Sequence, residues 1–394
     1  MKEGWEYKKL GDIGTFIRGG NFSKKDFVED GFPCIHYGQI HMKFGVETLK
    51  NISSVPAEMV KNDRCAKKGD LVIAITSEDD AGSCKCTAWM GDYDVYVGGH
   101  TAIYRHTMQP KYVSYYFMSP YFQKDKLEYT HGFKVVEISP KDIAKISIPV
   151  PSLSEQQSIV DYLDSAFAKI DAMKANAEKA LNEAKALFQA SLKEMLEPKE
   201  GWEEKKIDEI CTIARGGSPR PIKDYITNDP NGLNWIKIGD TDMGGKYIYS
   251  TKEKIKPEGL KKSRWVEVDD FLLSNSMSFG RPYILKTNGC IHDGWLVLRD
   301  YQKYLNIDFF YYVLSSENVQ RQFRTKAQGS TVSNLNTDRV ASVIIHVPTF
   351  EEQQCIVATL DSLKSKVDRL QENFDKISQE CDALKQAILR QVFE

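Results

Sequence analysis

The chain contains an internal repeat, and the repeat limits the architectures into which it can fold. Gly4-Trp5-Glu6 recurs as Gly201-Trp202-Glu203. A longer segment, residues 151–164, recurs as residues 348–361 with Pro, Glu-Gln-Gln, Ile-Val and Leu-Asp at matching positions. The offset between the copies is the same near both ends of the repeat, so the 394 residues form two units of nearly equal length.

The middle parts of the two units match poorly. Short insertions displace the match around Tyr37-Gly38-Gln39 and Ile238-Gly239-Asp240. A shared framework with divergent middle parts is expected of two modules that bind different ligands, and simple drift after duplication is the alternative. Drift should also have blurred the segments at which the helices start, yet these match best, which favours different ligands.

Each unit ends in a long helical pattern, at residues 152–198 and 349–394. Apolar residues recur there in alternating steps of four and three, a period of 3.5 that is typical of a coiled-coil seam. The predicted seam of the first helix is Ile159, Leu163, Ala166, Ile170, Met173, Ala177, Ala180, Ala184 and Leu187. That of the second is Ile356, Leu360, Leu363, Val367, Leu370, Phe374, Ile377, Cys381, Leu384 and Ile388. Ser154 is the predicted N-cap of the first helix.

A seam needs a partner, and the economical partner is the other helix of the same chain. A whole module separates the two helices along the sequence, so a pair related by a pseudo-two-fold axis would be antiparallel. Each helix has roughly 40 residues and would be about 60 Å long. The alternative is oligomerisation through separate coiled coils.

The two globular modules, residues 1–151 and 199–348, carry short apolar runs interrupted by Gly, Pro, Asn and Asp. Residues 146–150 and 343–347 indicate terminal strands that end at proline, and residues 112–129 and 307–324 indicate helices with aromatic faces. We therefore expect two α+β domains joined by two long antiparallel coiled-coil helices.

Charge and hydropathy restrict the class of protein. The net charge is −2, with the acidic excess in the two helices and weakly basic modules, which permits DNA binding without requiring it. No apolar run approaches the roughly 18 residues of a membrane span, and the charged start does not resemble a signal peptide. We expect a cytoplasmic protein whose eight cysteines are reduced and mostly buried.

The loops of the modules carry the candidate contact residues. Arginine beside glycine can approach a phosphate closely, and Arg, Asn, Gln, Ser and Glu side chains read base edges. The candidates in the first module are Arg18, Gly19, Gly20, Ser77, His131 and Lys134. Those in the second are Arg215, Gly216, Ser218, Arg220, Asn275, Ser276, Arg281, Gln328, Ser330 and Thr331. Tight turns with solvated polar side chains are the alternative interpretation.

Sequence motifs of common catalytic centres are absent. The chain has no phosphate-binding G-x-x-x-x-G-K-[ST], no dinucleotide-binding G-x-G-x-x-G and no H-E-x-x-H. It also has no Asn/Asp-Pro-Pro-Tyr segment of the kind that amino-methyltransferases use, and a lone Cys84-x-Cys86 is a poor metal signal. We therefore expect neither catalysis nor a metal in this chain.

The order of module, long helix, module and long helix, with the repeated Pro-x-x-x-Glu-Gln-Gln-x-Ile-Val-x-x-Leu-Asp, resembles the DNA-specificity subunit of type I restriction-modification systems. The resemblance covers essentially the whole chain. It implies two target recognition domains, 1–151 and 199–348, with a central spacer helix at 152–198 and a C-terminal spacer helix at 349–394. Each domain would read one half of an asymmetric, bipartite site in double-stranded DNA.

The resemblance also implies partners. The helices would dock two methyltransferase (modification) subunits that carry S-adenosylmethionine, and restriction subunits could then join. No cofactor is expected in this chain, and no membrane contact. The residues expected to form the coiled coil and the docking surface are Gln156, Gln157, Leu163, Ile170, Gln353, Gln354, Leu360, Val367, Leu370 and Phe374.

Two other functions remain open from the sequence alone. One is a fused DNA methyltransferase/endonuclease, against which the missing motifs count. The other is a coiled-coil scaffold whose modules bind proteins.

Overall fold

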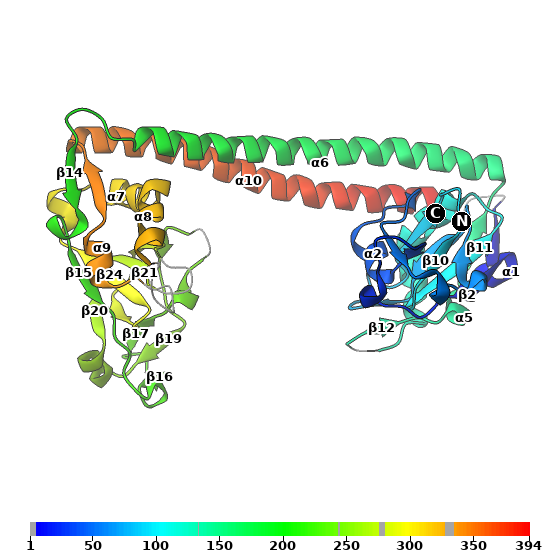
Figure 1. The fold of residues 1–394 in the computed structure, drawn as a ribbon, viewed down its shortest axis with the longest axis horizontal. Coiled ribbons are helices and arrows are strands. Elements are labelled where there is room, and N and C mark those ends of the chain that lie inside the picture. The colour runs from blue at the N-terminus through cyan, green and yellow to red at the C-terminus, as the bar shows by residue number, and fades with distance from the viewer. Residues whose placement is uncertain (1–4, 133, 243–244, 276–279, 328–334) are drawn as a thin grey trace. The chain divides into compact units, whose positions relative to one another are not determined.

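The computed structural model describes residues 5–132, 134–242, 245–275, 280–327 and 335–394 (Figure 1). Contacts divide the chain into two compact units, Met1–Glu178 with Asn373–Glu394, and Lys179–Glu372. Each unit holds one module and a part of each long helix, so the division does not fall in a linker between modules.

The first module has two main sheets. Its five-stranded sheet has the order β2-β11-β7-β9-β4, and its four-stranded sheet the order β5-β3-β10-β6. Strand pairs are antiparallel except β4 with β9 and β3 with β10. The strands are β2 (Gly14–Arg18), β3 (Phe32–Ile35), β4 (Glu47–Thr48), β5 (Ser53–Val55), β6 (Cys65–Ala66), β7 (Leu71–Ala74), β9 (Cys86–Trp89), β10 (Val95–Val97) and β11 (Thr101–His106).

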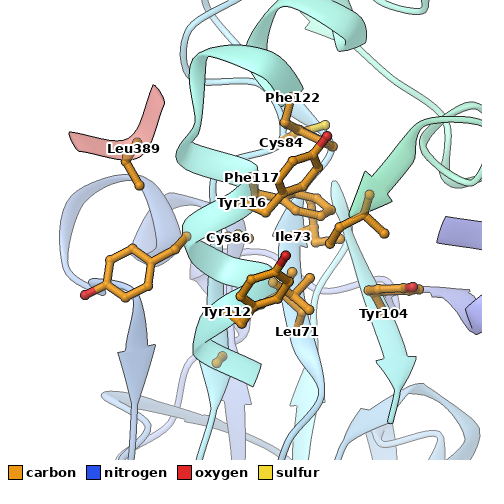
Figure 2. Close-up of a cluster of buried hydrophobic side chains, with 14 of the residues drawn as sticks. Leu71, Ile73, Cys84, Cys86, Tyr104, Tyr112, Tyr116, Phe117, Phe122 and Leu389 are labelled. Carbon is orange, nitrogen blue, oxygen red and sulfur yellow. The ribbon is translucent and has the colours of Figure 1, made fainter. Parts of the chain in front are cut away.

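Two short helices cover one face of the five-stranded sheet. Helices α3 (Pro110–Met118) and α4 (Pro120–Asp125) bring Tyr112, Phe117 and Phe122 against Leu71 and Ile73 of β7 (Figure 2). A single helix over residues 112–129 was the prediction, and that prediction is wrong. Pro120 has no N–H with which to continue α3, and the Ser119 side chain caps the new helix instead.

The second module repeats this arrangement. Its sheets have the orders β15-β24-β21-β22-β18 and β16-β19-β17-β23-β20, with α7 (Ile307–Ser315) and α8 (Glu317–Ala327) in place of α3 and α4. The predicted α+β class is confirmed. The single helix predicted over residues 307–324 is wrong, because the chain breaks at Ser316, whose side chain caps the second helix at Val319 N. The strands are β15 (Thr212–Arg215), β16 (Ile226–Thr227), β17 (Leu233–Ile236), β18 (Tyr247–Ile248), β19 (Glu253–Ile255), β20 (Arg264–Val266), β21 (Phe271–Ser274), β22 (Pro282–Leu285), β23 (Gly289–Ile291) and β24 (Trp295–Arg299).

The predicted terminal strands are also confirmed, and they close each module on its own start. Strand β13 (Ser147–Val150) pairs with β1 (Glu6–Lys9), and β25 (Ile344–Val347) pairs with β14 (Glu203–Lys206), both antiparallel. Three short elements complete the parts used below: β8 (Thr76–Ser77) paired with β12 (Val136–Glu137), and helix α2 (Tyr37–Met42).

The two long helices are α6 (Leu153–Met195) and α10 (Phe350–Phe393), and they pack together in antiparallel orientation as expected. In the first unit Lys174 Nζ lies 3.6 Å from Asp382 Oδ1, and Lys385 Nζ lies 2.5 Å from Asp171 Oδ1. A step of three residues along one helix is thus matched by a step of three in the reverse direction along the other. The α6 N-cap is Ser152, whose Oγ accepts from Glu155 N at 3.3 Å, and not Ser154.

The seam of α6 differs in part from the prediction. Every second position of the predicted seam is right: the residues there that face the partner helix or the module are Leu163, Ile170, Ala177 and Ala184. The positions between them were predicted to be Ile159, Ala166, Met173 and Ala180. They are instead one residue further along the helix, at Val160, Phe167, Lys174 and Leu181. Met173 and Leu187 are 59% and 60% exposed. The Ala-rich stretch has apolar residues on both sides of the true seam, so apolarity alone does not select the register. In α10 the predicted seam holds through Cys381, whereas Leu384 is 47% exposed.

A buried glutamine joins each helix to its own module. Gln156 Oε1 accepts from Gln109 N at 2.9 Å, and Gln156 Nε2 donates to Pro151 O at 2.8 Å. In the second unit Gln353 Oε1 accepts from Asn306 N at 2.7 Å. Each glutamine therefore binds the backbone at the start of α3 or α7, where an N–H has no partner within the helix.

A charged contact beside this joint is conserved between the units with its signs reversed. In the first unit Lys111 of α3 lies 3.2 Å from Glu47 of β4 and 2.5 Å from Asp164 of α6. In the second unit the helix carries the acid: Asp308 of α7 lies 2.5 Å from Lys246, which precedes β18. The contact between strand and helix is thus retained although neither residue type is.

Candidate nucleic-acid interface

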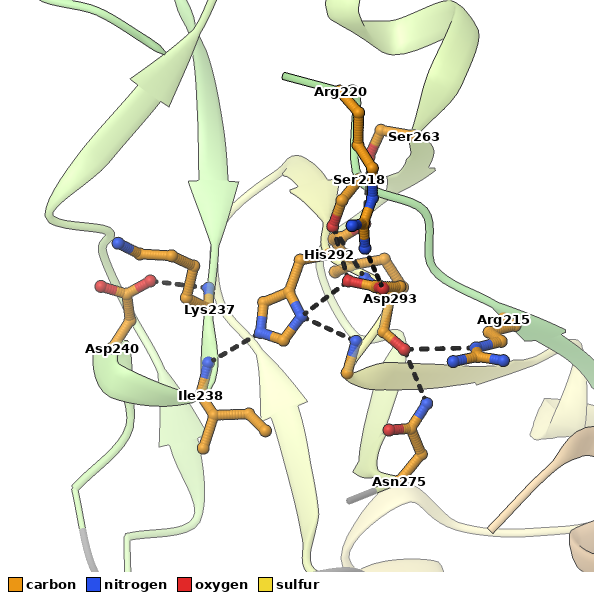
Figure 3. A network of polar contacts seen from close by, with 12 residues as sticks. Arg215, Ser218, Arg220, Lys237, Ile238, Asp240, Ser263, Asn275, His292 and Asp293 are labelled. Carbon is orange, nitrogen blue, oxygen red and sulfur yellow. Dashed lines mark hydrogen bonds and ion pairs between the residues drawn. The ribbon is translucent and has the colours of Figure 1, made fainter. Parts of the chain in front are cut away.

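Loops of the second module converge on Asp293, in the turn between β23 and β24 (Figure 3). Its carboxylate accepts a hydrogen bond from Ser218 Oγ at 2.6 Å and pairs with Arg220 at 3.3 Å. Its backbone carbonyl accepts from Asn275 Nδ2 at 2.8 Å and from Arg215 Nε at 3.2 Å. Four residues that the sequence singled out, on two loops, therefore meet at a fifth that it did not.

The Asp293 carboxylate is held ionised by its neighbours. The hydrogen bond from Ser218 is the largest cause that lowers the pKa of this carboxyl below its usual value, and the charge of Arg220 acts in the same direction. The Arg220 side chain nevertheless remains 80% exposed. Asp293 thus orients the guanidinium without burying it, and donors are left for a phosphate or a guanine edge.

His292, next to Asp293, connects this turn to the loop after β17. Its Nδ1 accepts from Gly294 N at 2.7 Å, and its Nε2 lies 3.3 Å from Ile238 N (Figure 3). Burial lowers the pKa of the ring, so it is neutral at pH 7. A neutral imidazole has one acceptor nitrogen, so the shorter contact with Gly294 is the hydrogen bond and the other is packing.

Gly216 allows two chain segments to approach closely at this site. Its N–H donates to Trp295 O at 2.9 Å, and a Cβ at this position would lie 2.1 Å from the His292 carbonyl oxygen. Arg264, which the sequence analysis did not single out, donates from Nε to Arg215 O at 2.7 Å. At residues 215–217 the Arg-Gly-Gly segment therefore packs its backbone directly against the β23–β24 turn, with exposed arginines around it.

The first module builds the same junction. Gly19 N donates to Thr101 O at 3.0 Å, and Gly20 N donates to Val97 O at 2.6 Å. Arg64 NH1 donates to Gly19 O at 3.1 Å, whereas Arg264 of the second module binds the carbonyl one position earlier, at Arg215. The Arg-Gly-Gly segments of the two modules, at residues 18–20 and 215–217, thus form corresponding backbone hydrogen bonds.

The remaining candidates of the first module gather around Glu137. Arg18 NH2 lies 3.3 Å from Glu137 Oε1, His131 forms an isolated β-bridge with Glu137, and Ser77 lies opposite Val136 in the β8–β12 pair. Segments far apart in the sequence are thereby brought to one edge of the module.

Aromatic and imidazole rings that the sequence analysis missed lie at this edge. The Tyr37 ring is 5.4 Å from the His100 ring and 6.1 Å from the His41 ring, centroid to centroid. His41 Nε2 lies 3.1 Å from Thr76 O, and His100 has a positive φ of 63°. These rings meet edge to face, and such a ring cluster can pack on sugars or bases, in contrast to the Asp293 cluster of the second module. The two candidate surfaces therefore differ in chemistry although their backbones correspond.

A cleft of about 1340 Å³ lies beside these residues in the first unit. Tyr37, His41 and Glu78 line it from the module, and Asp164 and Lys385 line it from α6 and α10. Both signs of charge contribute, so the cleft has no simple preference for an anion or a cation.

The other predicted contact residues lie apart from these two clusters or outside the described residues. Lys134 is exposed, and Arg281 is exposed with its backbone bonded to Ser274. Ser276, Gln328, Ser330 and Thr331 lie outside the described residues.

The residues predicted for docking and the coiled coil separate into two groups. Gln157 and Gln354 are exposed. Gln156 and Gln353 are 1% and 0% exposed and bind their own modules, which corrects the expectation that they face a partner. Of the apolar residues, Leu163, Ile170, Leu360 and Val367 are buried within their units, whereas Leu370 and Phe374 are half-buried.

Among the described residues, no group of three or more His, Cys, Asp or Glu side chains is arranged to hold a metal ion. None of the described helices is long and apolar enough to cross a membrane. The eight cysteines are free thiols, and all except Cys355 are buried. Burial raises the pKa of the Cys34 and Cys65 thiols to about 11, so neither is a reactive thiolate at neutral pH.

The chain matches one protein family twice. The family described as "Type I restriction modification DNA specificity domain" matches residues 2–183 and again residues 199–379. The two matched segments together cover most of the chain, and they coincide with the two copies of the repeat.

Individual relatives are also specificity subunits, and two solved structures share the fold. The type I restriction enzyme StySPI specificity subunit of Salmonella potsdam is 22% identical, over 100% of this chain and 89% of its own length. The EcoKI specificity subunit of Escherichia coli strain K12 is 21% identical with the same coverage. The fold resembles a chain solved in a study of assembly of the type I R-M system, with a TM-score of 0.81 at 19% identity, covering 100% of this chain and 98% of that one. The HsdS subunit from Thermoanaerobacter tengcongensis gives 0.61 at 19% identity, covering 100% and 97%.

Proposed function

Because the chain belongs to the family of type I restriction-modification DNA specificity subunits, we propose that each of its modules reads one half of a split, asymmetric site in double-stranded DNA. Within that family the chain is a non-catalytic recognition subunit. Neither the fused methyltransferase/endonuclease nor the protein-binding scaffold is supported by the matches.

The observation that carries the proposal is the pair of corresponding but chemically different loop clusters. The second module offers the exposed Arg215 and Arg220 beside Asp293, and arginine side chains bind phosphates and base edges. Asn275, only 1% exposed, holds the Asp293 carbonyl and is not free to contact DNA. The first offers Arg18 and the ring cluster of Tyr37, His41 and His100 at the same place in the fold. Different side chains on one framework favour two different half-sites, so the whole site would not be a palindrome.

Specificity subunits of type I complexes bind DNA and associate with modification and restriction subunits. For this chain we propose two modification subunits, one for each repeat, because a docking surface on one copy recurs on the other. The exposed Gln157 and Gln354 begin such equivalent surfaces on α6 and α10. S-adenosylmethionine would bind the modification subunits, and the complex would work on DNA in the cytoplasm.

The antiparallel helices would set the gap between the half-sites. Helices of 43 and 44 residues are long enough for the purpose, since each rises about 1.5 Å per residue and a DNA turn is about 34–36 Å. The proposal makes the helix length a determinant of the spacer and leaves the bases of each half-site to the modules.

The experiment is a comparison of the host methylome with the gene intact and deleted, by single-molecule sequencing. The expected result is loss of one methylated motif that has two unlike halves separated by a fixed gap. A methylome that is unchanged, together with no site-selective methylation when the chain is added to its purified modification subunit, would overturn the proposal.

A further inference from the structure

Lys126, in the 3-10 turn η4 (Lys126–Glu128), is a buried lysine with 1% of its surface exposed. Its ammonium donates to the carbonyl oxygens of Asp80 and Ser83, both at 2.6 Å. Burial lowers the pKa of this ammonium from its usual value, which measures how unfavourable the position is for a charge. A buried charge is retained only where hydrogen bonds compensate for lost water, and here the two carbonyls do so.

Both carbonyls belong to the loop between β8 and β9, residues 78–85. Within the loop, Gly82 N donates to Asp79 Oδ1 at 2.7 Å and Ser83 Oγ donates to Asp80 O at 2.8 Å. Lys85 Nζ at its far end donates to His41 O at 2.6 Å. The loop is therefore bound through Lys85 to the backbone of His41 and through two of its carbonyls to Lys126.

The loop carries three acidic residues directly after a candidate DNA contact. Glu78, Asp79 and Asp80 are exposed, and Ser77 immediately before them is a candidate DNA contact. Carboxylates repel DNA phosphates, but they accept hydrogen bonds from the amino group of cytosine. Such a loop can recognise a base only when its carboxylates are held in one place. A displaced carboxylate would still repel the DNA phosphates but would no longer accept a hydrogen bond from a base.

The second module has a different residue at the position that corresponds to Lys126. Gln123 donates to Phe117 O at 2.6 Å and its counterpart Gln320 donates to Leu314 O at 2.7 Å, which aligns α4 with α8. Three residues further on, the first module has Lys126 and the second has Phe323, which is 0% exposed. A Cβ on Gly280, which ends the loop after β21, would lie 3.0 Å from the Phe323 ring. An apolar residue is thus compatible with the fold at this position.

We propose that Lys126 is a positioning residue for DNA recognition: by binding Asp80 and Ser83 it fixes the loop that reads the first half-site, without touching DNA. The inference rests on the proposed function of the first module. Phe323 at the corresponding position of the second module shows that the fold does not require a cation there. The role of Lys126 is therefore to bind and position the loop. Its positive charge also attracts the carboxylates of Asp79 and Asp80 in that loop.

The test uses the complete complex of the chain with its modification subunits and a duplex library randomised in both half-sites. Lys126→Met keeps the aliphatic stem and removes both hydrogen bonds, and Lys126→Phe copies the second module. Lys124→Met, at an exposed lysine two residues away, is the matched control. The measurement is the ratio of methylation rates between preferred and altered bases at each half-site.

The expected result for both Lys126 variants is a loss of about tenfold in discrimination at the first half-site, the size of one base contact, with the second half-site unchanged. Full retention of discrimination at the first half-site would overturn the inference. Loss of discrimination at both half-sites in the Met variant would mean that the module has unfolded. The Phe variant then gives the test: loss at the first half-site alone supports the inference, and full retention there overturns it. A wild-type complex that selects no split site would instead refute the proposed function.

Discussion

The side-chain oxygen of Gln156 lies 2.9 Å from the backbone nitrogen of Gln109, and the same bond recurs between Gln353 and Asn306 at 2.7 Å. Each bond connects the first turn of a long helix to the first turn of a module helix. The repeated Glu-Gln-Gln segment is therefore a structural joint at its middle residue and an exposed surface at its last residue.

Removing the joint should destabilise the second unit. Gln353→Leu leaves the Asn306 N–H and the Pro348 carbonyl without their side-chain partner in a buried position, which costs about 1–3 kcal/mol of the free energy of unfolding. Denaturant unfolding of the purified chain measures the loss. Gln354→Leu, at the exposed neighbour, should change it by less than about 0.5 kcal/mol, and equal losses in the two variants would contradict the joint.

Two leucines of α6 test the seam register. Leu181 is 3% exposed and Leu187 is 60% exposed, although a uniform heptad continued from the sequence places Leu187 in the seam. Leu181→Ala should lower the free energy of unfolding by about 2–3 kcal/mol, whereas Leu187→Ala should change it by about 0.5 kcal/mol or less. A larger loss of stability in Leu187→Ala than in Leu181→Ala, measured by thermal or denaturant unfolding, would contradict this register and support the uniform heptad.

Acid should weaken the first module through His106. Burial lowers the pKa of this ring to about 4 from its usual 6.5, and the ring packs on Tyr104 with centroids 4.9 Å apart. A lowered pKa means that the unfolded chain takes up the proton first. The stability that the neutral ring contributes is therefore complete above pH 6.5 and is lost as the pH falls from 6.5 toward 4.

The variant His106→Phe keeps a ring against Tyr104 and removes this titration. Between pH 7 and pH 4.5 the wild-type chain should lose on the order of 2 kcal/mol more stability than the variant. The free energy of unfolding by urea at several pH values gives the comparison. Parallel pH profiles of the two proteins would show that His106 is not the group responsible.

Arg220 should contribute to DNA binding mainly through charge. Its guanidinium is 80% exposed beside Asp293. If it neutralises one phosphate, Arg220→Gln in the assembled complex should reduce the slope of log affinity against log salt by about 0.9. Lys303→Gln is the control, because Lys303 is exposed in η9 (Tyr301–Lys303) beyond the other end of β24. Titrations of a duplex carrying the site at several salt concentrations measure both slopes, and an unchanged slope for Arg220→Gln would remove it from the interface.

The repeat, the α+β modules and the antiparallel helices could all be predicted, because each depends on a pattern extended over many residues. The seam of α6 could be predicted only in part. Ala166 and Phe167 are both apolar, and which of them faces inward depends on the opposing helix and not on the local sequence. The break at Pro120 was visible in the sequence, but the run of aromatic residues around it favoured one helix.

The candidate interface divides in the same manner. Arg215, Ser218, Arg220 and Asn275 could be singled out as polar loop residues, but their common neighbour Asp293 has the appearance of an ordinary Asp-Gly turn. Lys126 lies between Asp125 and Leu127 in a polar stretch that indicates a solvated helix end. Its burial results from the loop that folds over it, and only the tertiary structure brings that loop to it.

The central claim is that each module reads its own half-site. The most direct measurement replaces residues 201–350 with the corresponding module of another member of the family and determines the methylated motif of the reconstituted complex. The account predicts that one half of the motif changes while the other half and the gap between them are preserved. A change in both halves, or in neither, would contradict it.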